Sequence, residues 1–116
     1  MIKIATQISV HVKCPPMVAF ECAKKALFSF KNLQHQFADP TVMTVSAKLY
    51  HTIDETPITG LKAAIVTIKE FNHEKSELTI TADFLSKNVC QMNVIFFIAE
   101  FLKRFSGFVN EIQPDS

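Results

Sequence analysis

Three places in this chain hold side chains that could do chemistry, because a thiol, an imidazole or a carboxylate stands near a possible partner. They are Cys90, the group His51, Asp54 and Glu55, and the pair His11 and Cys14. Each predicts a different kind of site: a nucleophile, a general acid–base group, or two ligands of a metal ion. Each also has an ordinary structural explanation that must be weighed beside it.

Cys90 is the candidate nucleophile. It falls at the expected start of the last helix, where the positive end of the helix dipole lowers the pKa of a thiol. Nucleophilic catalysis also requires a base close to the thiol, and the sequence brings no histidine to Cys90. His51, Asp54 and Glu55 lie at a strand end and loop, where acid–base residues often stand, but polar loops routinely carry such residues. An enzyme using either group is therefore our third hypothesis, and no catalytic residue is assigned.

His11 and Cys14 have the H-x-x-C spacing of half a metal site. In a regular strand, residues three apart point to opposite faces of the sheet, so both side chains cannot bind one ion without a bulge. Cys22 and His35 could complete the set only through a fold that nothing in the sequence supports. We therefore expect no metal and no other cofactor.

Nucleotides and nucleic acids are poor candidates as partners. The chain has two glycines, Gly60 and Gly107, which cannot make a phosphate-cradling loop. Its 12 basic and 11 acidic residues leave a net charge of +1, without the basic patch that nucleic acid requires. Tyr50 is the one aromatic residue expected on the outward side of the strands, and one ring is a thin platform for stacking bases.

Hydropathy and cysteine usage predict a soluble cytoplasmic protein. Three cysteines at irregular spacing fit reduced, mostly buried thiols. The stretch M-I-K-I-A-T-Q-I-S-V lacks the long apolar core of a signal peptide. No apolar run reaches the roughly 18 residues of a membrane-spanning helix.

The elements that would position these side chains follow from periodicity. Residues 2–14 alternate apolar and polar side chains, which predicts a long strand with one buried face. Pro15-Pro16 ends this strand and opens a helix over about 17–31. Strands are expected over about 41–52, 61–71 and 76–84, the second of these being central because both of its faces are partly apolar.

The last helix is expected over about 88–106, with Ser86 or Asn88 as its cap and Gly107 as its stop. Residues 108–112 could fray, extend this helix or form a short further strand. The whole chain, 1–116, then forms a single α+β domain in which two helices, including a long C-terminal one, cover one face of an antiparallel sheet of about four strands. This β-α-β-β-β-α order resembles that of helix-grip folds, in which a curved sheet wraps a long C-terminal helix, although about four strands leave little room for a cavity.

The last helix has more apolar surface than docking on one sheet requires. In V-I-F-F-I-A-E-F-L-K-R-F, steps of about 100° per residue place a polar stripe along one side. The stripe contains Asn93, Glu100, Arg104 and Glu111, with Phe97 inside it. The expected sheet-docking face contains Ile95, Ile98, Leu102, Phe105 and Val109, and the apolar arc is widened by Met92, Phe96, Ala99 and Phe101. A curled sheet, a second subunit or an apolar ligand could each cover the excess.

Two hypotheses compete with the enzyme. The first is a small non-enzymatic homo-oligomer or adaptor that associates through the last helix, because Phe97 on a charged stripe is poorly explained by packing within the chain. The second is a carrier for an apolar small molecule held between this helix and the sheet. The residues expected to form the interface or the ligand site are Phe96, Phe97, Phe101, Phe105 and Phe108.

Overall fold

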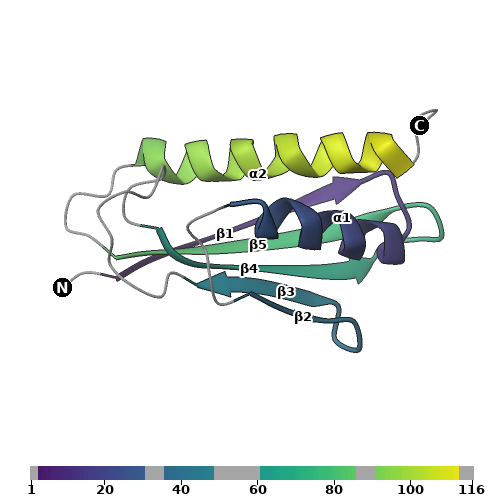
Figure 1. Cartoon of the computed structure of the whole chain (residues 1–116), viewed down its shortest axis with the longest axis horizontal. Coiled ribbons are helices and arrows are strands. Elements are labelled where there is room, and N and C mark those ends of the chain that lie inside the picture. Colours follow the sequence, from purple (N-terminus) through teal and green to yellow (C-terminus); the bar gives the residue numbers. More distant parts are fainter. Residues whose placement is uncertain (1–2, 31–35, 49–60, 86–90, 113–116) are drawn as a thin grey trace.

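The computed structural model describes residues 3–30, 36–48, 61–85 and 91–112, which form five strands and two helices (Figure 1). In chain order these are β1 (Lys3–Val12), α1 (Pro16–Phe28), β2 (Phe37–Asp39), β3 (Thr44–Lys48), β4 (Leu61–Glu70), β5 (Ser76–Leu85) and α2 (Gln91–Ile112). All strand pairs are antiparallel, and the sheet order is β1-β5-β4-β3-β2. The predicted α+β class, with β4 as a central strand, is confirmed.

The alternating patterns predict the faces of the long strands correctly. Val10 pairs with Leu78, and Leu78 pairs on its other side with Ile68, so apolar side chains meet across three strands. Leu78 is fully buried and Ile68 nearly so. The neighbouring outward position carries Thr79, whose hydroxyl lies 3.1 Å from the hydroxyl of Ser9 across the β1–β5 pair. One face of the sheet is therefore covered and the other is mostly polar.

The edge formed by β2 and β3 differs from the prediction. Strand β2 falls where a polar connection was expected, because three residues are too few to show an alternating pattern. Strand β3 begins at Thr44 instead of about residue 41, since a turn precedes it. In that turn the hydroxyl and amide of Thr41 donate to Asp39 Oδ1 at 2.6 and 2.9 Å, which lowers the pKa of Asp39. Met43 then takes a left-handed φ of 49°. The rest of the predicted strand, residues 49–52, lies outside the described residues.

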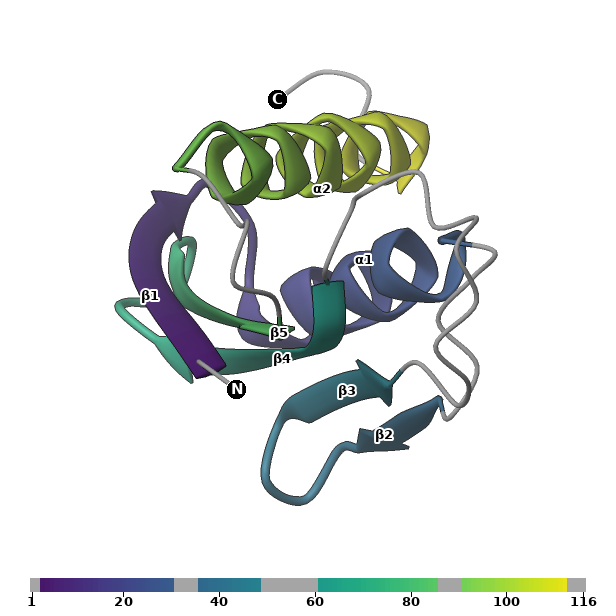
Figure 2. The ribbon, with the colours of Figure 1, turned by 90° about the vertical axis from the view of Figure 1, so that its left-hand side faces the viewer.

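Both helices lie on the same face of the sheet. Helix α1 packs against β3, β4, β5 and α2, and Figure 2 shows the sheet curving upward at β1 toward α2. Helix α1 begins at Pro16, where a proline costs nothing because the first-turn amides have no partner within the helix. No helix among the described residues is long and apolar enough to cross a membrane.

Helix α2 continues through Gly107 to Ile112, so the predicted stop at this glycine is wrong and the helical alternative for 108–112 is correct. Glycine inside a helix costs about 1 kcal/mol relative to alanine. Phe108 and Val109, which follow it, pack against the core, and this packing offsets the cost. The predicted caps, Ser86 and Asn88, lie outside the described residues.

Candidate functional site

Phe97 is fully buried, and its expected position on a solvent-facing stripe is wrong. Its ring lies 5.3 Å from the ring of Phe30, which follows α1, and 6.4 Å from that of Phe101. Phe101 lies 6.3 Å from Phe105, so four aromatic rings form one continuous series in the core. Phe97, Phe101 and Phe105 are at most 3% exposed, and their apolar surface is used within the chain.

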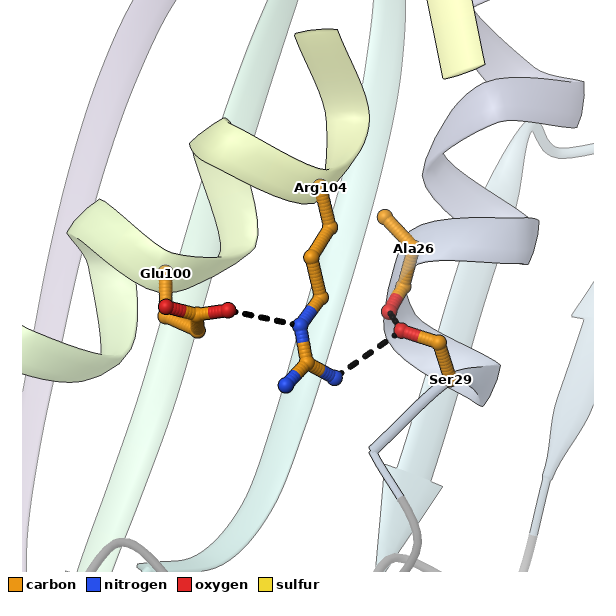
Figure 3. Close-up of polar contacts among 4 residues, drawn as sticks. All are labelled: Ala26, Ser29, Glu100 and Arg104. Carbon is orange, nitrogen blue, oxygen red and sulfur yellow. Dashed lines mark hydrogen bonds and ion pairs between the residues drawn. The ribbon is translucent and has the colours of Figure 1, made fainter. Parts of the chain in front are cut away.

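The polar side of α2 faces α1 and not solvent alone. Arg104 Nε donates to Glu100 Oε2 at 2.9 Å, and another guanidinium nitrogen of Arg104 donates to Ser29 Oγ at 3.0 Å (Figure 3). Ser29 Oγ in turn donates to the carbonyl of Ala26 at 2.6 Å. The Arg104 guanidinium lies 4.1 Å from the centre of the Phe30 ring. These contacts join α2 to the end of α1 and place the guanidinium over the Phe30 ring.

Among the described side chains of α2, three large apolar ones are exposed: Ile95, Phe96 and Ile112. Ile95 is 53% and Phe96 57% exposed. The prediction that Ile95 docks on the sheet is wrong, since the buried arc of the helix is centred between Phe97 and Ile98 and leaves Ile95 at its margin. Phe108, the remaining predicted site residue, is half-buried, with the Lys25 ammonium 6.0 Å from its ring centre.

The described residues form a hollow where the end of β1 passes the C-terminal half of α2. Its volume is about 250 Å³. It is lined by Val12, Lys13, Cys14, Phe105, Ser106, Val109 and Asn110, and we call it the β1–α2 hollow. Figure 1 shows the tip of β1 beneath this end of α2. Sequence reasoning named Phe105 as a site residue and put Val12, Cys14 and Val109 on buried faces, but it did not bring these segments together.

The hollow combines an apolar wall with a polar rim. Val12, Phe105 and Val109 supply aliphatic and aromatic surface, whereas Ser106 and Asn110 supply a hydroxyl and an amide. This is the usual composition of a small-molecule site, in which a few polar groups orient a largely apolar ligand. A cavity of about 150 Å³ is large enough for benzene, so the hollow can hold a bicyclic molecule or a ring with a short chain.

Cys14 is held rigidly in the wall of the hollow. Its carbonyl accepts a hydrogen bond from the hydroxyl of Ser76 at 2.7 Å, and both residues are fully buried. Burial, with a smaller contribution from nearby Cys22, raises the pKa of the Cys14 thiol to about 11. Burial likewise raises the pKa of Cys22. Cys14 therefore acts as a neutral, apolar wall group and not as a nucleophile.

The other predicted chemistry finds no support in the described residues. His51, Asp54, Glu55 and Cys90 lie outside them. The His11 ring packs against the ring of Phe71, tilted by 34° and 4.4 Å away between centres, and His11 Nε2 lies 3.3 Å from Glu77 Oε2. Because these contacts hold His11 away from the buried Cys14, the two do not form a metal half-site. Within the described parts of the chain, no group of three or more His, Cys, Asp or Glu side chains could hold a metal ion.

Comparisons with known proteins identify the fold but no family. No family model matches the sequence, and no curated protein matches it. Among solved structures, the ZhuI aromatase/cyclase from Streptomyces sp. R1128 is similar with a TM-score of 0.63 at 11% identity, over 97% of this chain and 94% of that one. A Thalictrum flavum norcoclaurine synthase mutant in complex with a transition-state analogue gives 0.62 at 7% identity, over 97% of both chains. The protein Ara h 8.0201 gives 0.61 at 10% identity, over 94% of this chain and 99% of that one. Identities this low show the architecture alone, and that architecture is the helix-grip fold.

Proposed function

We propose that this protein is a small binding or carrier domain for an apolar molecule held between α2 and the sheet. The β1–α2 hollow carries this proposal, because its apolar wall and polar rim have the composition of a ligand site. Its volume of about 250 Å³ limits the ligand to about two fused rings or their equivalent. The fold gives further support, since one similar structure, the norcoclaurine synthase, was determined with a transition-state analogue bound.

Filling the hollow tests the proposal. The substitution Val109→Phe adds bulk at the wall, where Val109 packs between the core and the hollow. We expect it to weaken uptake of 2-naphthamide, a neutral bicyclic probe, by about tenfold, which corresponds to about 1.4 kcal/mol. Binding can be followed by probe fluorescence or by chemical-shift changes.

Ile112→Phe is the matched control. It makes a similar aliphatic-to-aromatic change on the same helix at a residue that is 45% exposed and not part of the hollow, so we expect unchanged uptake. Wild-type protein that takes up neither 2-naphthamide nor its carboxylate analogue 2-naphthoate, or a Val109→Phe variant that binds as well as wild type, would show that the hollow is not a ligand site.

A self-associating domain is the second candidate, and exposed Ile95 and Phe96 favour it. Two neighbouring large apolar side chains, each more than half exposed, leave apolar surface that a second copy could cover. Association would have to use Ile95 and Phe96 instead of the predicted Phe97 and Phe101, because the rings of Phe97 and Phe101 are buried and not available to a partner. A native mass spectrum distinguishes the candidates, since assembly gives multiples of 13.1 kDa and a carrier gives a monomer with extra, extractable mass.

A further inference from the structure

Of the described residues that line the β1–α2 hollow, Lys13 is the one that carries a charge. Lys13 lines the hollow, is exposed, and makes no ion pair among the described residues. Strand β1, which leads into it, has no acidic residue between Lys3 and Val12. The lining itself contains no carboxylate. An ionic partner for the Lys13 ammonium is therefore absent from the described part of the hollow.

Helix α2 adds to this asymmetry. With about 100° per residue, Lys103 falls on the same side of the helix as Ser106 and Asn110, which belong to the rim. The two acidic residues of α2, Glu100 and Glu111, fall on the side toward α1. Glu100 is paired there with Arg104. Glu111 contributes to the raised pKa of Cys22 in α1, which places its carboxylate near that helix.

We propose that the hollow selects apolar ligands that carry one negative charge, such as aromatic or short aliphatic monocarboxylates, over neutral molecules of the same shape. This inference rests on the proposed function. The apolar body would lie against Val12, Phe105 and Val109, and the carboxylate would face the Lys13 ammonium at the mouth. The Ser106 hydroxyl and the Asn110 amide can each donate a hydrogen bond to a carboxylate oxygen. A cationic ligand would find no carboxylate in the lining.

The test compares 2-naphthoate with 2-naphthamide, which have the same ring system and differ by one charge. At neutral pH we expect wild-type protein to bind the carboxylate about fivefold more tightly, the upper range for an exposed ion pair. Lys13→Met removes the charge and keeps most of the length of the side chain, so it should abolish this preference without changing the dissociation constant of the amide. Lys48→Met, an exposed residue of β3 outside the hollow, should keep the preference. Titration calorimetry or fluorescence measures the six dissociation constants, two for each of the three proteins.

Each other result overturns part of the reasoning in a recognisable way. Equal binding of the two probes by wild-type protein, or an unchanged preference in Lys13→Met, refutes charge selection and leaves the proposed function standing. Binding of neither probe refutes both the charge selection and the carrier function. A preference that persists at 1 M salt, where the screening length falls to about 3 Å, also contradicts the exposed ion pair.

Discussion

Replacing Phe97 by alanine should destabilise the protein far more than replacing its neighbour Phe96. Phe97 is fully buried, whereas Phe96 is 57% exposed. Full burial of a phenylalanine contributes about 2–3 kcal/mol, and the ring contacts of Phe97 with Phe30 and Phe101, at 5.3 and 6.4 Å, add about 0.5–1.5 kcal/mol. We therefore expect Phe97→Ala to lower the free energy of unfolding by about 3–5 kcal/mol, and Phe96→Ala to lower it by about 1 kcal/mol or less.

Urea titration followed by far-UV circular dichroism measures both variants, because the chain contains no tryptophan to report by fluorescence. For a domain of this length about 4 °C of melting temperature corresponds to each kcal/mol, so Phe97→Ala should melt about 12–20 °C below wild type. The comparison with Phe96→Ala removes the effect of helix propensity, which is the same in both. Losses that agree within about 1 kcal/mol would refute the burial of Phe97 against α1.

Two further predictions concern Arg104 and Cys14. Arg104→Met should lower the free energy of unfolding by about 1–2 kcal/mol, because it removes two hydrogen bonds and the contact with the Phe30 ring. As the control, Lys103→Met should lower it by less than about 0.5 kcal/mol in the same urea titration. Equal losses in the two variants would contradict the role of Arg104. Burial raises the pKa of Cys14 from 9.0 to about 11, so its contribution to stability is complete below pH 9.0 and is lost as the pH rises through about 11. Between pH 9.0 and about 11, the free energy of unfolding should therefore fall less steeply in Cys14→Ala than in wild type. Iodoacetamide should leave Cys14 of the folded protein unmodified at pH 8. Rapid modification of Cys14 would argue against its burial.

The long strands and both helices could be predicted because each buries a regular pattern. Strands β1 and β5 alternate apolar and polar residues over many positions, which indicates a strand with one buried face. Strand β4 was predicted from apolar residues on both of its faces. Strand β2 could not be predicted, since three residues show no period. The continuation of α2 beyond Gly107 could not be predicted either. Glycine favours the end of a helix, but here the packing of Phe108 and Val109 against the core outweighs that preference, and only the tertiary structure shows this packing.

The misplacement of Phe97 has a specific physical cause. A helical wheel shows which residues share a side, but not which neighbour covers that side. Glu100 and Arg104 predicted that this side of α2 faces solvent. In the structure the Arg104 guanidinium instead donates to Ser29 after α1, and Phe97 packs against Phe30 in the core. Long charged side chains commonly cover apolar surface in this way. The hollow was missed for a related reason: residues 12–14 and 105–110 meet only because the sheet curves toward α2.

The pairing of β1 with β5 also shapes how the chain reaches its fold. Val12 pairs with Ser76, and Lys3 pairs with Leu85, so every rung of this ladder spans more than half of the chain. During synthesis β1 is the first of the described elements to leave the ribosome. Its partner β5 is made only after α1, β2, β3 and β4. Contacts so distant in sequence slow folding, toward milliseconds to seconds in sheet proteins, and leave an unpaired strand open to aggregation during synthesis.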